Sequence, residues 1–332
     1  MGNTAVILHH ALSPDALPDE TDVLVQTKAV SEALKTLGYE THTVSLGLDI
    51  TALATRLGRL RPVIVFNLVE SLDGDGRLIH LACSILDHLG IPYTGAGTEA
   101  MFLTSNKVLA KEWMRGAGIP TPEWIAAGRT PEAALPFPAA YIVKTLWEEA
   151  SIGIDRGSVR DAASLPELTA ALDERSRILG KPCFAERFVD GREFNLSILG
   201  GTHGPRVLPP AEIIFSFPDD RPRLVDYKAK WDEASVEYRC TGRSFRFEAE
   251  DAPLLEALRA VALSCWEAFD LRGYARVDFR VDGQGRPWVL EINANPCISP
   301  DSGFVAASEM AGLTYPEVIE CIVSDTLDRR AS

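Results

Sequence analysis

Cysteine is sparse in this sequence, and no two cysteines form a CxxC pair. The six residues are widely scattered, at Cys83, Cys183, Cys240, Cys265, Cys297 and Cys321. Zinc sites and disulfide frameworks both need closely or regularly spaced cysteines. The spacing therefore indicates neither kind of site, and we expect most of these thiols to be small core residues.

Positive charge and long apolar runs are also scarce. Lysine and arginine number 33 against 47 aspartates and glutamates, which gives a net charge of −14. No basic run is dense enough to follow a phosphate backbone, and this disfavours a nucleic-acid partner. The first apolar stretch, residues 5–8, is too short for a signal peptide or a membrane span. We therefore expect a cytoplasmic protein with no membrane partner.

Hydrophobic residues make up 46% of the 332 positions, enough for two or three domains. Strand-like and helix-like segments, including a helical stretch around 30–39, alternate over residues 5–90, which predicts a parallel α/β layer. A helix over 106–118 then ends at Gly118, because Pro120 and Pro122 block its continuation.

The remainder of the chain predicts an α+β arrangement. Strands at 139–145 and 182–189 flank a helix over 164–180, and this makes a small module. Further strands are expected at 193–201 and 244–250, then a helix over 253–269 and a hairpin over 275–296. The predicted fold class is therefore α/β with α+β units, and no internal repeat is visible.

The hairpin carries the sharpest chemical signal, in the stretch "VLEINANP". If its turn centres between Gln284 and Gly285, Asp278 lies opposite Glu291 and Arg276 lies opposite Asn293, all on one face. Opposed carboxylates repel, so two acids beside an amide favour a hard cation, Mg²⁺ or Mn²⁺. The alternative is an edge hairpin with a solvated charged face.

A magnesium site implies a nucleotide, because Mg²⁺ is usually held by one or two carboxylates together with substrate phosphates. Lys144 ends a predicted strand, and the small residues Ser151 and Gly153 follow in a loop that backbone N–H groups could line. Lys107 begins a helix and is a weaker candidate. An ordinary surface turn and solvated lysines are the alternatives for these residues.

Two further groups of residues suit a nucleotide site. A segment between domains, with Glu186, Phe188, Val189 and Glu193, could bind adenine by its main chain and ribose by a carboxylate. Lys230 and Arg276 could stabilise charge on transferring oxygens, although both could be ordinary structural charges. A strand followed by a β-turn is the alternative for the first group.

Taken in order, the motifs "LGIPYTGAG", "NKVLAKEWMRGAGIPTP", "YIVK", "ASIGI", "GREF", "DYKAKW" and "ARVDFRVDGQGRPWVLEINANP" resemble the D-alanine–D-alanine ligase group of the ATP-grasp superfamily. The resemblance implies that Lys107 and Lys144 bind ATP phosphates. It implies further roles for a longer set: Glu186, Phe188 and Val189 on adenine, Glu193 on ribose, Asp278, Glu291 and Asn293 on magnesium, and Arg276 on the reacting oxygens.

The sequence departs from this family where the substrates bind. The glutamate that holds the first substrate's ammonium cannot be placed securely in "LHHALSPDALPDETD", and Glu20 is the candidate. Ala150 and Trp231 stand where the family has hydroxyl-bearing residues. Ser302 and the backbone of Gly303 match the contacts to the acceptor carboxylate. Cys297 replaces a glycine and is expected to be a backbone donor.

The resemblance implies a three-domain ATP-grasp enzyme divided at residues 1–103, 104–187 and 188–332. We expect it to join a carboxylate and an amine of amino acids or small peptides through an acyl phosphate, with substrates other than D-alanine. Arg276, Lys230 and Ser151 form the expected catalytic set, Trp231, Ser302 and Gly303 the substrate set, and a homodimer is expected. The alternatives are a true D-alanine–D-alanine ligase, an ATP-grasp phosphotransferase and a non-catalytic nucleotide-binding regulator.

Overall fold

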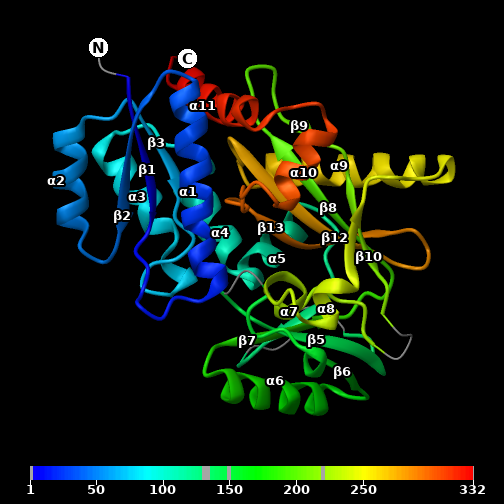
Figure 1. Ribbon diagram of the computed structural model, residues 1–332. Helices are drawn as coiled ribbons and strands as arrows, with labels where there is room; N and C mark the ends of the chain where they lie inside the picture. Colours follow the sequence, from blue (N-terminus) through cyan, green and yellow to red (C-terminus); the bar gives the residue numbers. More distant parts are fainter. Residues whose placement is uncertain (1–2, 129–134, 148–150, 218–220, 332) are drawn as a thin grey trace.

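The computed structural model describes residues 3–128, 135–147, 151–217 and 221–331, which form three sheets with covering helices (Figure 1). The first sheet is parallel, in the order β2-β1-β3, as the sequence predicts. It comprises β1 (Thr4–His10), β2 (Glu40–Leu46) and β3 (Ile64–Leu68), with α1 (Pro18–Thr36), α2 (Ile50–Leu60) and α3 (His80–Leu89) around it.

Alternating side chains of β1 supply two cores, one on each face of this sheet. Ala5 and Ile7 pack with Val23 and Val30 of α1. Val6 and Leu8 point to the opposite face, where they pack with residues of α2 and α3. Because both faces are covered there, β1 and β3 are almost entirely buried, whereas the edge strand β2 is partly exposed and more polar.

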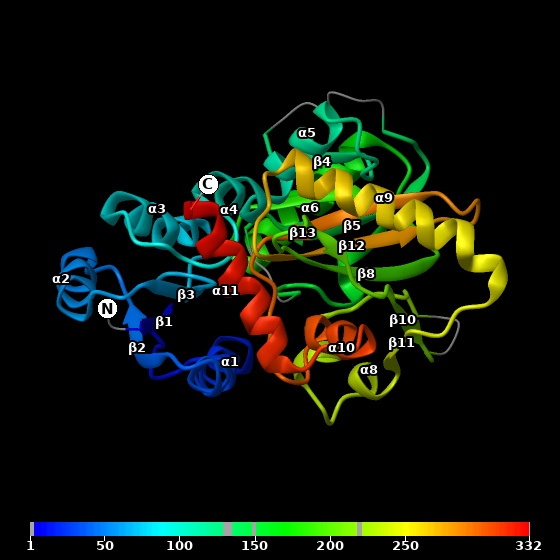
Figure 2. The ribbon, with the colours of Figure 1, turned by 90° about the horizontal axis from the view of Figure 1, so that it is seen from above.

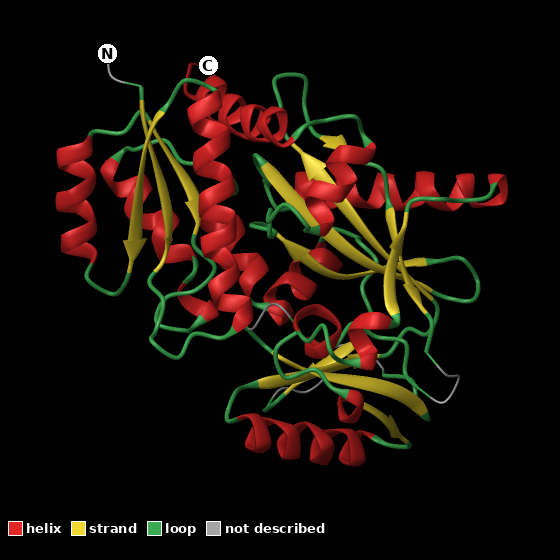
Figure 3. Cartoon of the chain, in the orientation of Figure 1, coloured by secondary structure: helices red, strands yellow, loops and turns green. Residues whose placement is uncertain are grey.

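The second sheet is four-stranded and antiparallel, in the order β4-β7-β5-β6 (Figure 3). Its strands are β4 (Trp124–Ala126), β5 (Ala139–Thr145), β6 (Val159–Ala162) and β7 (Cys183–Arg187). One face is covered by α6 (Leu165–Leu179), which Ser164 caps by accepting a hydrogen bond from the Glu167 N–H. This is the small module expected around residues 139–189, with two additional short strands.

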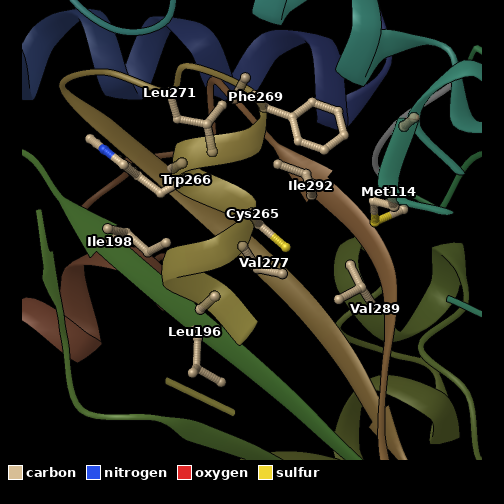
Figure 4. Packing of buried hydrophobic residues seen from close by; sticks show 14 of the residues in the cluster. Met114, Leu196, Ile198, Cys265, Trp266, Phe269, Leu271, Val277, Val289 and Ile292 are labelled. Carbon is tan, nitrogen blue, oxygen red and sulfur yellow. The ribbon is translucent and has the colours of Figure 1, made fainter. Parts of the chain in front are cut away.

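The third sheet is the largest, in the order β11-β10-β8-β12-β13, with β9 added beside β8. Its strands are β8 (Arg192–Leu199), β9 (Arg206–Val207), β10 (Ala211–Phe215), β11 (Thr241–Ser244), β12 (Tyr274–Val281) and β13 (Pro287–Asn293). Helix α9 (Ala252–Ala268) packs on one face, where Cys265 and Trp266 meet Leu196, Ile198 and Val277 (Figure 4). Helices α4 (Thr98–Ser105) and α5 (Lys107–Gly116) contribute to the same core.

The C-terminal helices connect the large sheet back to the first one. Helix α10 (Gly303–Met310) precedes α11 (Tyr315–Ala331), and Val318, Ile319 and Ile322 share a core with Phe66 of β3 (Figure 2). Two short helices, α7 (Tyr227–Trp231) and α8 (Val236–Arg239), lie between β10 and β11 in the chain. Three 3₁₀ turns complete the described elements, at Gly76–Leu78, Arg156–Ser158 and Ala249–Asp251.

Two expectations about local structure are wrong in extent. The strand predicted over 244–250 is instead the end of β11 followed by an irregular segment, because Phe245 and Phe247 enter two different cores. Helix α1 starts twelve residues before the predicted helical stretch at 30–39, at Pro18, where the Glu20 carboxylate accepts a hydrogen bond from the Leu17 N–H at 2.9 Å. Proline at the first helical position and this carboxylate both favour a helix start there.

Candidate active site

The β12–β13 hairpin sets Asp278 opposite Glu291 and Arg276 opposite Asn293, as predicted. The turn, however, centres on Gln284, since Val281 pairs with Pro287. A β-bulge between Asp278 and Phe279 restores the predicted pairing further along the strands. This hairpin face is not a solvated one, because Asp278 is 7% and Asn293 is 8% exposed.

Asp278 is the centre of a hydrogen-bond network on this face. The Arg276 guanidinium donates to both of its carboxylate oxygens, at 2.7 and 2.8 Å. The amides of Asn195 and Asn293 also donate to it, at 2.8 and 3.2 Å. Burial tends to lower the pKa of Arg276, but Asp278 outweighs it, and the net shift is upward. Arg276 is therefore held in the charged form.

Glu291 faces lysines from three other elements. Its Oε2 lies 2.8 Å from the Lys107 ammonium at the start of α5. Burial raises the pKa of Glu291, but Lys107, Lys230 and Lys144 together outweigh burial and hold it well below its ordinary value. Burial also lowers the pKa of the Lys230 ammonium, and nearby Arg276 adds to that shift. The structure thus brings Lys107, Lys144 and Lys230 to the carboxylates of the hairpin.

A second buried cluster lies behind Lys144. Glu186, which is fully buried on β7, contacts the ammonium groups of Lys144 and Lys111, each at 2.5 Å. Burial raises the pKa of Glu186, but the two lysines lower it by more. The net shift is downward, so the carboxylate stays ionised. The Glu186 side chain therefore holds Lys144 in place.

The segment after β7 belongs to a cluster of aromatic and charged side chains. The Glu193 carboxylate pairs with the buried Arg280 guanidinium at 2.8 Å. Arg280 lies over the rings of Phe188 and Phe215, at 5.5 and 5.6 Å from their centroids. Burial raises the pKa of Glu193, although Arg280 opposes the shift. Val189 is buried beside this segment.

The loop that contains Ser151 contacts the segment before α7. Ser151 has a left-handed φ of 61°, and its hydroxyl donates to the Val225 carbonyl at 2.9 Å. A second link joins Arg156 to Glu237 at 2.8 Å. Residues 148–150, which include Ala150, lie outside the described part of the chain. The Nε1 atom of Trp231 is buried and has no hydrogen-bond partner among the described residues.

The predicted acceptor residues lie at the start of α10. The Ser302 hydroxyl caps this helix by accepting from the Val305 N–H at 3.3 Å. A Cβ at position 303 would lie only 3.2 Å from the Arg243 guanidinium, so Gly303 allows this side chain of β11 to approach. Arg243 was not among the predicted site residues.

Another contact joins α1 to the loop after β13. Asp22 accepts hydrogen bonds from the Ser299 hydroxyl at 2.8 Å and from the Cys297 thiol at 3.1 Å. Gln26 binds the same loop through the Ile298 N–H. Burial raises the pKa of the Cys297 thiol, and the negative charge of Asp22 adds to this shift. Cys297 is thus a protonated hydrogen-bond donor.

Glu20 lies two residues before Asp22, near the start of α1. Its neighbour Asp19 accepts a hydrogen bond from the Tyr227 hydroxyl of α7 at 2.7 Å. His10, at the end of β1, is buried near both acids, and its pKa is lowered mainly by burial and secondly by His9. The first sheet therefore presents its carboxyl edge to the rest of the site, where ligands of α/β sheets usually bind.

Oxygen ligands at Asp278, Glu291 and Asn293 fit magnesium or manganese. Within residues 3–128, 135–147, 151–217 and 221–331, no three His, Cys, Asp or Glu side chains come together as a metal site. Two carboxylates and an amide are nevertheless the donors that Mg²⁺ uses when phosphates complete its shell.

The described helices also include none long and apolar enough to cross a membrane.

The family described as "D-ala D-ala ligase C-terminus" matches residues 114–324. A D-alanine–D-alanine ligase of Synechococcus is 33% identical over 312 residues, covering 92% of this chain and 88% of that protein. The chain belongs to the D-alanine–D-alanine ligase family. It is thus an ATP-grasp ligase, an enzyme that forms a carbon–nitrogen bond between an acid and an amino acid.

Two further proteins are similar over nearly the whole chain. An uncharacterised protein of Sinorhizobium fredii is 33% identical over 310 residues, covering 91% of this chain and 87% of that protein. The crystal structure of a D-alanine–D-alanine ligase from Bacillus anthracis matches with a TM-score of 0.73 at 22% identity, over 100% of this chain and 99% of that one. The latter likeness establishes the ATP-grasp fold.

Sequence reasoning missed four residues that shape this site. Lys111 sits in the quoted helix motif, and its i+4 spacing from Lys107 could have indicated a second inward lysine. Arg280 alternates with Arg276 and Asp278 along β12, so strand periodicity could have found it. Asp22 and Arg243 gave no local signal, because their partners are 277 and 60 positions away in the chain.

Proposed function

We propose that the protein joins the carboxylate of one amino acid or small peptide to the amine of another, using ATP and releasing ADP and phosphate. The observation that carries the proposal is the convergence of Arg276, Asp278, Glu291 and three lysines on one hairpin face. Such a cluster suits a triphosphate with its metal beside a reacting carboxylate.

Nucleotide binding is assigned to the following residues. Lys107 and Lys144 would contact the phosphates, Glu186, Phe188 and Val189 the base, and Glu193 the ribose. Glu186 would also hold Lys144. Asp278, Glu291 and Asn293 would hold Mg²⁺ or Mn²⁺, which supplies charge neutralisation at the phosphates.

In the first step, the donor carboxylate attacks the γ-phosphorus of ATP, and ADP leaves. In the second, the acceptor amine attacks the acyl carbon, phosphate leaves and the amine loses a proton. Arg276 and Lys230 are placed to stabilise negative charge on the reacting oxygens. Ser151 lies on a loop that would exclude water from the acyl phosphate.

We propose that the acceptor binds near Ser302, Gly303 and Trp231, and that D-alanine is not the preferred substrate. Trp231 offers one N–H donor on a larger ring in place of the family's hydroxyl, and Ala150 offers none. Each lost hydrogen bond to a carboxylate costs about 1.5–3 kcal/mol unless another contact replaces it. The names of the relatives favour D-alanine dimer formation as the second candidate.

A screen of amino-acid pairs for ADP formation, with products analysed by mass spectrometry, tests this proposal. We expect Mg²⁺-dependent ADP release with at least one pair, a new amide product, and a lower kcat/KM for D-alanine. If D-alanine dimerises best and Trp231→Tyr changes nothing, the substrate proposal is wrong. Phosphorylation of a substrate without amide formation would indicate a phosphotransferase, and nucleotide binding without turnover a regulator.

Three remaining proposals concern the whole chain. We propose a homodimer, which light scattering after size-exclusion chromatography would test. We also propose a cytoplasmic location, which cell fractionation would test. We also propose units at 1–103, 104–187 and 188–332, which limited proteolysis would test through cleavage near the two boundaries. A monomer in solution, or cleavage within the proposed units alone, would contradict the corresponding proposal.

A further inference from the structure

Arg243 is a charged residue of the acceptor end that the proposed function does not yet use. It lies on β11, the edge strand of the large sheet, and pairs through its backbone with Ile213 of β10. Its guanidinium reaches the start of α10, where its closest approach to an ideal Cβ of Gly303 is 3.2 Å. Figure 2 shows α10 beside β10 and β11. The guanidinium therefore lies against the backbone proposed to contact the acceptor.

Two guanidinium groups, those of Arg243 and Arg276, lie close enough for their charges to interact. Arg243 is exposed as a whole, but dehydration of its guanidinium lowers its pKa. The charge of Arg276 lowers this pKa further, whereas the charge of Asp301 raises it. The two arginines therefore repel each other. Arg276 is matched by Asp278, whereas no described carboxylate lies within ion-pair distance of Arg243. Two like charges held together are stabilised when an anion binds near both.

The two guanidinium groups also differ in what they can reach. Arg276 is engaged by both oxygens of Asp278, on the hairpin face with the proposed metal ligands. Arg243 approaches from the opposite edge of the sheet, beyond Ser302 and Gly303. With Ser302 and Gly303 on the acceptor's α-carboxylate, Arg243 is placed for a second negative group on the same molecule.

We propose that Arg243 is a specificity-determining residue that selects an acceptor with a second carboxylate, such as an acidic amino acid or a short peptide containing one. This inference rests on the proposed ligase function. It supplies a contact in place of the missing hydroxyls, because an arginine–carboxylate pair is a strong, directional interaction.

Arg243→Gln tests the proposal, with Arg246→Gln as the matched control. Arg246 is an exposed arginine just after β11, so its substitution removes the same charge without altering the contact at Gly303. The acceptor panel contains the D- and L-forms of aspartate and glutamate, each compared with asparagine and glutamine. We expect wild type to favour the acids, and Arg243→Gln to lower kcat/KM for them by about 10- to 100-fold. The amides should change by less than about 3-fold.

A binding measurement separates this inference from the ligase proposal. In the presence of Mg²⁺ and a non-hydrolysable ATP analogue, thermal unfolding is followed with glutamate or glutamine as probes. Wild type and Arg246→Gln should be stabilised more by glutamate, and Arg243→Gln should lose that difference. Equal responses to both probes, or an equal loss for all acceptors in the kinetic assay, would overturn the inference. Absence of ADP formation despite selective glutamate binding would instead count against the ligase function alone.

Discussion

The proposed nucleotide end of the site lies on paired strands, whereas the proposed substrate end lies at helix starts and on loops. Asp278, Glu291 and Asn293 share one face of a hairpin, and the two carboxylates are matched by neighbouring cations. Ser302 and Gly303 begin α10, and Trp231 ends α7. Strand pairing constrains side chains to one face, while loops and helix ends can change without disturbing a core. The proposed nucleotide residues thus lie on constrained strands, and the proposed substrate residues lie where the sequence is freer to change.

The largest effect is expected from Glu291→Gln at the nucleotide end. The substitution removes a proposed metal ligand and the negative charge that faces Lys107, Lys144 and Lys230. We expect kcat/KM for ATP to fall by about 100-fold or more, with the fold retained. Glu309→Gln, on the exposed surface of α10, is the control and should keep full activity. Full turnover of Glu291→Gln in Mg²⁺ would remove Glu291 from the metal site.

Lys144→Ala should have the next largest effect, on both binding and chemistry. A cation that contacts transferring phosphates acts in the ground state and in the transition state, so the KM for ATP should rise and kcat should fall, each about 10-fold. Unfolding should also be easier, by less than the about 3–5 kcal/mol of a fully broken buried pair, since Lys111 still faces Glu186. The exposed Lys35→Ala is the control. Unchanged ATP kinetics would leave Lys144 with a structural role only.

Acid should weaken the nucleotide end through Glu186 and Glu291. Both carboxyls have a pKa below the ordinary 4.5 in the folded chain. Their stabilisation is therefore complete above about pH 4.5 and is lost as the pH falls through the folded values. Urea unfolding between pH 7 and pH 3 should show this loss, and the free energy of unfolding of Glu186→Gln should fall less steeply with acid. An equal fall in wild type and variant would show that the pKa of Glu186 is not lowered in the folded chain.

Asp22→Asn should give the smallest effect, at the substrate end. The amide retains one acceptor oxygen but loses the charge that binds Ser299 and Cys297. We expect unfolding to become easier by about 1–2 kcal/mol and the KM for the amino-acid substrates to rise more than the KM for ATP. Asp173→Asn, on the exposed face of α6, is the control. A larger rise for ATP than for the amino acids would contradict this division of the site.

The sequence by itself determined the hairpin, the pairing of Asp278 with Glu291, and the order of the family's motifs. These features depend on alternation along strands and on a short turn, which are local in the chain. The alternation of strand-like and helix-like segments over residues 5–90 also predicted the parallel first sheet, whose two faces are covered by helices. In contrast, the alternation of apolar residues did not predict the irregular path of residues 245–248. Phe245 and Phe247 alternate as in a strand, but they pack in two different cores.

Only the tertiary structure decided which charges meet across long separations. Glu186 is committed to Lys111 and Lys144, Arg280 to Glu193, Asp22 to Ser299, and Arg243 to the backbone at Gly303. None of these contacts follows from a local pattern, because each depends on how sheets and helices from different parts of the chain pack together. A buried charge takes its role from the partners that packing brings to it, and so the roles of these residues become visible in the folded chain.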